Sequence, residues 1–171
     1  MKKIFFILFI VFISSCSDKL TNSKAEKIFK DCVQQGKYFE TKPLLIGNIS
    51  SYLFKNEDVE LYTKLKNEGL ITMEKKRNKY NIILTDKAKK YISETYTDYG
   101  FNFAKVIIFY YGFEKIKEIY ENPSNNTAEV KIIIKKENET PFMLLNNDDF
   151  PENKIVTFKY RKTNNGWKLC D

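Results

Sequence analysis

Few residues of this chain could carry chemistry, because its 171 residues include three cysteines and no histidine. Histidine is the commonest general base and a frequent metal ligand, so its absence excludes Ser-His-Asp and Cys-His nucleophile systems. Cys32 and Cys170 have neither the close pairing of a structural zinc site nor the Cys-x-x-Cys spacing of a redox centre. Glycine-rich phosphate-binding loops are also absent from the sequence. We therefore expect no metal, no cofactor and no enzymatic activity.

The adjacent carboxylates Asp148 and Asp149 are the remaining candidates for acid–base chemistry. Some hydrolases need only two carboxylates, so a carboxylate-dependent hydrolase is the alternative to a non-catalytic protein. The pair lies beside Asn146 and Asn147, however, in a polar stretch that is typical of a solvated turn. We expect a turn here rather than a catalytic pair.

Cys16 follows a segment that has the parts of an export signal. Lys2 and Lys3 precede an unbroken apolar run over residues 4–13. That run is too short to cross a hydrocarbon core of about 30 Å, which takes roughly 20 apolar residues in a helix. The four residues from Ile13 to Cys16, Ile-Ser-Ser-Cys, resemble the lipobox of bacterial lipoproteins.

The resemblance to lipoproteins implies that residues 1–15 are a signal peptide and that Cys16 carries diacylglyceryl and acyl groups in the mature protein. Two or more acyl chains hold a protein stably to a membrane, whereas one holds it only marginally. We expect a cell-envelope protein anchored by lipid on Cys16, with residues 16–23 as the tether. Since Ser17 and not aspartate follows the cysteine, the outer membrane is favoured in a host with two membranes. The alternative is an ordinary secretory signal in which Cys16 is incidental.

The other two cysteines are predicted to pair. Export would place Cys32 and Cys170 in an oxidising compartment, as an even number with one possible connectivity. A disulfide between them would tie the first helix to the final strand, and the alternative is two separate thiols.

The charge of the mature chain is moderately basic. Without Lys2 and Lys3 it has 27 basic and 22 acidic side chains, so the formal charge falls from +7 to +5. A basic balance of this size favours binding to anionic headgroups or envelope polymers, and it is also compatible with a solvated, lysine-rich surface that binds no partner. The expected partners are the membrane, through the lipid anchor, and an envelope protein or polymer.

Residues 24–100 are predicted to form a helical part. A stripe at helical spacing runs from Ala25 through Ile28, Phe29, Cys32 and Val33, and a second helix runs from Asn56 to Gly69. Residues 38–52, with Pro43 and Gly47, fit an extended segment better than a helix. A hairpin with a basic tip follows, and Thr85 can cap a third helix that runs through Tyr91.

Residues 65–92 resemble the wing half of bacterial winged-helix regulators of the antibiotic-resistance type. The matching features are Gly69-Leu70-Ile71, the basic hairpin tip, and Leu84-Thr85-Asp86 before a basic segment. The helix that would enter a DNA groove carries four acidic and two basic residues, which should repel phosphates. We therefore expect no nucleic-acid partner. These charges are Glu57, Asp58, Glu60 and Glu68 against Lys64 and Lys66.

Residues 101–171 are predicted to form an antiparallel β part. Residues 104–111 suit a strand buried on both faces, while residues 130–134 and 156–160 alternate as half-buried strands. Asn164-Asn165-Gly166 predicts a hairpin turn. Residues 113–120 fit either a helix or a strand, and we favour the strand. The predicted fold class is thus α+β, with a helical, winged-helix-like part followed by an antiparallel sheet of four or five strands.

Aromatic residues gather between Tyr91 and Phe113, where they could bind sugar rings or a partner, or simply pack the core. Taken together, these patterns predict a non-catalytic, membrane-anchored envelope lipoprotein with a binding or scaffolding domain.

Overall fold

The computed structural model describes residues 19–33 and 38–169. Among the described helices, none combines the length and the apolar content needed to cross a bilayer. The elements follow the chain in the order α1 (Asn22–Val33), β1 (Phe39–Ser50), the 3-10 helix η1 (Ser51–Leu53), α2 (Asn56–Asn67), β2 (Ile71–Lys76), β3 (Lys79–Leu84), α3 (Asp86–Lys89), β4 (Ile92–Asp98), β5 (Phe101–Asn122), the 3-10 helix η2 (Pro123–Asn125), β6 (Thr127–Glu137), the 3-10 helix η3 (Pro141–Leu145), β7 (Asn153–Thr163) and β8 (Gly166–Lys168).

The predicted fold class is wrong, because one antiparallel sheet of eight strands runs through both halves of the chain. Its order is β2-β3-β1-β5-β6-β7-β8, and β4 pairs with β5. The expected sheet of four or five strands began at residue 101, whereas β1 and β4 from the N-terminal half pair directly with β5. Pairing to a 22-residue central strand merges the two predicted parts into one sheet.

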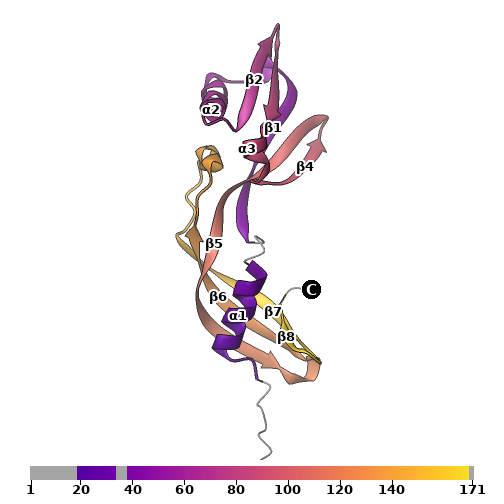
Figure 1. Cartoon of the computed structure of the whole chain (residues 1–171), viewed down its shortest axis with the longest axis vertical. Coiled ribbons are helices and arrows are strands. Elements are labelled where there is room, and N and C mark those ends of the chain that lie inside the picture. Colours follow the sequence, from indigo (N-terminus) through magenta and orange to yellow (C-terminus); the bar gives the residue numbers. More distant parts are fainter. Residues whose placement is uncertain (1–18, 34–37, 170–171) are drawn as a thin grey trace, which may run out of the picture.

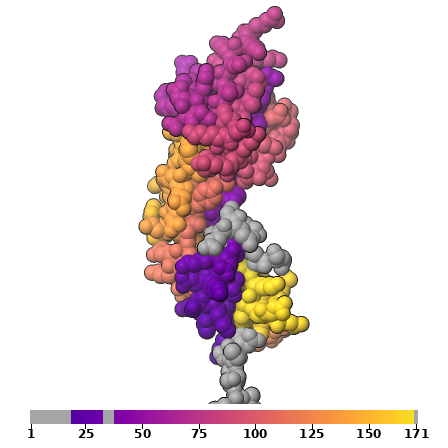
Figure 2. Space-filling model, viewed as in Figure 1, coloured from indigo at the N-terminus to yellow at the C-terminus, as the bar shows by residue number. Residues whose placement is uncertain are grey.

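The molecule is elongated, and β5 runs most of its length (Figures 1 and 2). We call the part that holds α2, α3, β2, β3 and β4 the upper lobe, and the part that holds α1, β6, β7 and β8 the lower lobe. The backbone N–H of Leu20 donates to Glu121 Oε1 at 2.9 Å, beside the turn between β5 and β6. The chain that leads into α1 therefore lies at the far end of the lower lobe, opposite the upper lobe.

Pro43 and Gly47 explain the path of β1. Over residues 39–46 the strand pairs with β5, and over residues 47–50 it pairs with β3. Pro43 lacks a backbone donor and is exposed, which suits a stretch of strand with only one neighbour. Gly47 has a φ of 87°, a left-handed conformation that favours glycine, at the point where the pairing changes. The predicted extended segment is confirmed as this long strand.

The lower lobe is held together by aromatic packing of α1 against the sheet. Phe29 is fully buried, and its ring lies 5.8 Å from that of Phe113 and 5.1 Å from that of Phe158. The hydroxyl of Tyr160 donates to the Ala25 carbonyl at 2.9 Å. The apolar stripe that predicted a helix is the face that packs on the sheet.

Two predictions about single elements have opposite outcomes. Residues 113–120 are strand, as favoured, since all of them belong to β5. The third helix does not reach Tyr91, because α3 ends at Lys89 and β4 begins at Ile92. Residues 92–98 include Ile92, Thr95, Tyr96 and Thr97, and β-branched and aromatic residues favour a strand over continuation of the helix.

Candidate binding surface

An apolar groove crosses the upper lobe between β1 and α2. Its volume is about 390 Å³, within the roughly 300–1,000 Å³ of typical ligand clefts. Five elements contribute to it: β1, η1 with the residue after it, α2, β5 and the tip of η3. Its apolar lining residues are Pro43, Leu44, Leu45, Leu53, Phe54, Leu61, Phe103 and Leu145, and its polar ones are Lys42, Asp58 and Tyr62.

Tyr62 fixes α2 against β1 along the groove. Its hydroxyl donates to the Leu45 carbonyl at 2.8 Å, and its ring lies 5.1 Å from that of Phe54. Burial raises the pKa of the Tyr62 phenol, so it stays protonated and able to donate. Phe54 also packs against Tyr80 of β3 at 5.1 Å. The walls of the groove are thus held by contacts among three elements.

Leu53 gives the groove an apolar mouth that a partner could cover. It lies in η1, and 54% of it is exposed to solvent. Complete burial of a leucine side chain is worth about 1.5–3 kcal/mol, so covering the exposed half of Leu53 could contribute about half of that to binding. An exposed leucine beside a concave apolar surface offers a partner apolar area to bury.

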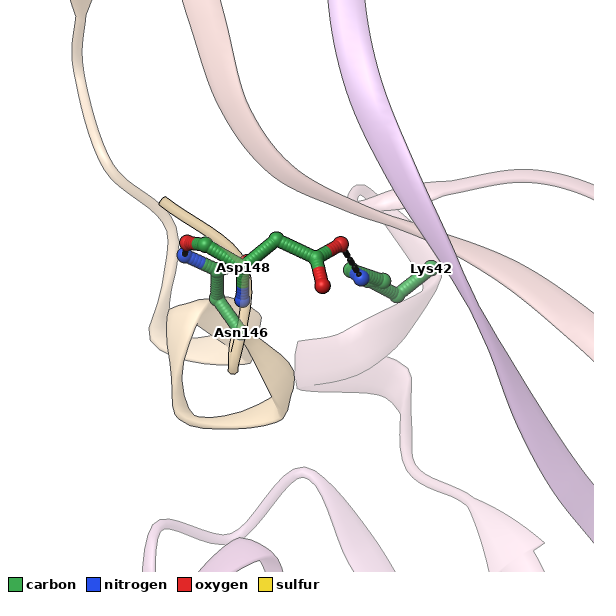
Figure 3. Close-up of polar contacts among 3 residues, drawn as sticks. All are labelled: Lys42, Asn146 and Asp148. Atoms are coloured by element: carbon green, nitrogen blue, oxygen red, sulfur yellow. Dashed lines mark hydrogen bonds and ion pairs between the residues drawn. The ribbon is translucent and has the colours of Figure 1, made fainter. Parts of the chain in front are cut away.

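Lys42, which lines the groove, forms an ion pair with Asp148 in the loop after η3 (Figure 3). The Lys42 ammonium donates to Asp148 Oδ2, and it also lies 5.7 Å from the centre of the Phe150 ring. Asn146 holds the turn by donating to the Asp148 carbonyl at 2.9 Å and accepting from the Asp148 N–H at 3.2 Å. The expected turn is present, and it connects to β1 through this ion pair.

Three carboxyl groups among the described residues have clearly shifted pKa values. A general acid needs a raised pKa. In the part of the chain that the structure describes, the carboxyl pKa values that clearly depart from the ordinary are all lowered. Hydrogen bonds cause each shift, from Lys64 to Glu60, from Lys89 to Asp86, and from Tyr120 and Lys131 to Glu118. Within residues 19–33 and 38–169, no group of three histidine, cysteine or acidic side chains is arranged to hold a metal.

The predicted aromatic cluster is divided between the core and the surface. Phe109 and Tyr111 are buried in the sheet. Tyr96 stacks on Phe103 at 5.3 Å with an interplanar angle of 18°, beside a second groove of about 440 Å³ between β3 and β4. Tyr99, in the β4–β5 turn, is 94% exposed. The exposed aromatic side chains are therefore separate from the buried ones, and the cluster does not form one continuous binding surface.

The predicted cysteine sites are only partly within the described residues. Cys16 and the rest of the lipobox lie outside them, and so does Cys170. Cys32 lies on α1 and is disulfide-bonded. The pairing of Cys32 with Cys170 stays a prediction, as does the lipid on Cys16.

The sequence reasoning missed the groove because its residues come from distant parts of the chain. One local signal was available for η3: Thr140 precedes Pro141, which is the pattern of a capping residue followed by proline at the first helical position. The Thr140 hydroxyl accepts from the Phe142 N–H at 3.1 Å, as a cap does. This short helix supplies Leu145 to the groove.

Comparison with known proteins identifies no relative, since no family model, no curated protein and no solved structure matches the chain.

Proposed function

We propose that this chain is a non-catalytic lipoprotein of the bacterial cell envelope, anchored through lipid on Cys16, whose upper lobe binds an envelope partner. The lipobox resemblance of residues 13–16 supports the anchor. The absence of aspartate after Cys16 supports the outer membrane where the host has two membranes.

The groove of the upper lobe is the observation that supports binding. It is apolar, it has an exposed leucine at its mouth, and it lies in the lobe remote from Leu20 and therefore from the tether. An anchor at one end of an elongated molecule would leave the groove free to meet a partner (Figure 1). The partner expected from this lining is an envelope protein that inserts one or two apolar side chains.

The hydrolase alternative is less well supported. Asp148 forms an ion pair with Lys42, and the carboxyl pKa values that are clearly shifted among the described residues are all lowered. Neither feature suits a general acid near neutral pH.

Site-specific photo-crosslinking in living cells tests the binding function. A photoreactive amino acid at position 53 should give a discrete crosslinked product, whereas the same residue at position 159, an exposed site on β7 in the lower lobe, should not. A Leu61→Trp change, which fills the groove, should reduce the product from position 53. Equal products from positions 53 and 159, or none from position 53, would contradict binding at the groove.

A further inference from the structure

The outer end of the upper lobe carries a concentrated positive charge. The turn between β2 and β3 projects at this end of the molecule (Figures 1 and 2). Residues 74–79 contain four basic side chains and one acidic one, and all of them are exposed. We call this group the basic tip: Lys75, Lys76, Arg77 and Lys79, with Glu74.

Ion pairing within the basic tip leaves most of its charge available. Glu74 lies 3.5 Å from Lys76, and both side chains are more than 60% exposed. An exposed pair of this kind contributes little, so it does not hold the lysine away from another anion. Lys75 lies over the Tyr80 ring at 5.5 Å, a contact that leaves its positive charge in place. The tip therefore presents a net charge of about three positive units to solvent.

An exposed tyrosine lies beside the basic tip. The Ser51 N–H donates to the Asn78 carbonyl at 2.8 Å, which brings η1 against the β2–β3 turn. Tyr52, the next residue, is 84% exposed. The first turn of α2, which follows in the chain, carries Glu57 and Asp58, and Asp58 accepts from the Lys55 N–H.

We infer that the basic tip, together with Tyr52, binds the surface of an anionic phospholipid bilayer. Lysine and arginine clusters are attracted to acidic headgroups, and tyrosine is favoured where an apolar acyl region meets water. A soluble polyanion would use the same basic residues but has no apolar layer for Tyr52. The tip lies at the opposite end of the molecule from the start of α1 and the turn between β5 and β6 (Figure 1). If the lipid is on Cys16, as the proposed function holds, the contacted bilayer would be a second one, and the protein would bridge two surfaces.

Vesicle association with the mature, full-length protein tests the inference. The protein is reconstituted in donor vesicles of phosphatidylcholine, and its capture of acceptor vesicles is measured with and without phosphatidylglycerol in the acceptors. We expect capture of the anionic acceptors alone, with strong loss on adding salt. Replacing three cations by K75Q, R77N and K79Q should weaken capture roughly a hundredfold, since each basic residue near an anionic surface changes the binding constant about fivefold. Asparagine is chosen at position 77 because Arg77 has a φ of 52° and asparagine tolerates that conformation.

The matched control removes the same charge from the lower lobe through K115Q, K117Q and K159Q, three exposed lysines. It should leave capture nearly unchanged, and an equal loss in both triple variants would overturn the inference. Tyr52→Ser should weaken capture of bilayers severalfold without affecting binding of soluble polyphosphate. If Tyr52→Ser has no effect on bilayers and polyphosphate binds as tightly as they do, the tip is a polyanion site and the bilayer inference is wrong.

Retention of the protein on the donor vesicles is scored separately, so that the two proposals can fail independently. Loss of the protein from neutral donors would contradict the lipid anchor. Binding of the released protein to anionic acceptor vesicles would still support bilayer binding by the basic tip. Failure of the released protein to bind them would contradict that inference.

Discussion

Replacing Thr140 by valine should destabilise the protein and loosen one wall of the groove. Thr140 is 5% exposed and is the one buried polar residue among those that the structure describes. Its hydroxyl donates to the Ile107 carbonyl of β5 and accepts from the Phe142 N–H at 3.1 Å. These two bonds hold the start of η3 against the sheet, and η3 carries Leu145 into the groove.

The expected decrease in the free energy of unfolding follows from the two hydrogen bonds that are lost in the valine variant. Valine has nearly the shape of threonine but cannot form either hydrogen bond. Phe142 is fully buried, so its N–H loses its capping acceptor without access to water. A buried group without a partner costs about 1–3 kcal/mol, and loss of a helix cap costs about 0.5–2 kcal/mol. These figures describe the same lost bonds, so we expect a decrease of about 2 kcal/mol in the free energy of unfolding.

Urea unfolding of the valine variant measures this decrease, with Thr140→Ser as the matched control. Serine keeps the hydroxyl and loses one methyl group, so it should cost less than valine, about 1 kcal/mol. Hydrogen exchange gives a local readout, because the Phe142 amide should lose protection in the valine variant alone. A valine variant as stable as the parent, with the Phe142 amide still protected, would refute the assigned role of the hydroxyl.

Three further predictions concern the core, the disulfide and nucleic acid. Tyr160→Phe should lower the free energy of unfolding by about 1 kcal/mol, because it loses the bond to the Ala25 carbonyl. Tyr111→Phe should cost less, because the buried Tyr111 hydroxyl has no hydrogen bond of ordinary geometry among the described residues, although Lys154 lies over the same ring. Urea unfolding of both variants compares the two losses. Protein purified from the envelope should contain no cysteine thiol that reacts with thiol reagents in denaturant, and two free thiols would exclude the bridge. Reduction of a Cys32–Cys170 disulfide should lower the free energy of unfolding by roughly 4–5 kcal/mol. The mature protein should not bind duplex DNA usefully through α2, whose first turn is acidic, and salt-sensitive binding in the roughly micromolar range or tighter in a filter or fluorescence assay would contradict this.

Local features of the fold could be predicted because their causes are local. The apolar stripe through Ala25 and Phe29 identified α1, and the turn residues before Gly166 identified the β7–β8 hairpin. The hairpin between β2 and β3 was found with its basic tip in the right place. Each of these elements is specified by periodicity or turn chemistry within a short window.

The fold class could not be predicted because strand pairing is not local. Sequence patterns place residues 38–52 in an extended state, but they do not say which strand it joins. Pairing of β1 with both β5 and β3 joins residues up to about 70 positions apart. The same limit applies to the groove, whose lining extends from Lys42 to Leu145 and is brought together only by the completed sheet.

The lipid anchor is the central claim, and intact mass spectrometry of the mature protein purified from envelope membranes tests it most directly. We predict a chain that begins at Cys16, with the added mass of diacylglyceryl and acyl groups on that residue and fatty-acid label that disappears in Cys16→Ser. A mature chain that begins elsewhere, or an unmodified Cys16 in protein that still fractionates with membranes, would contradict the account.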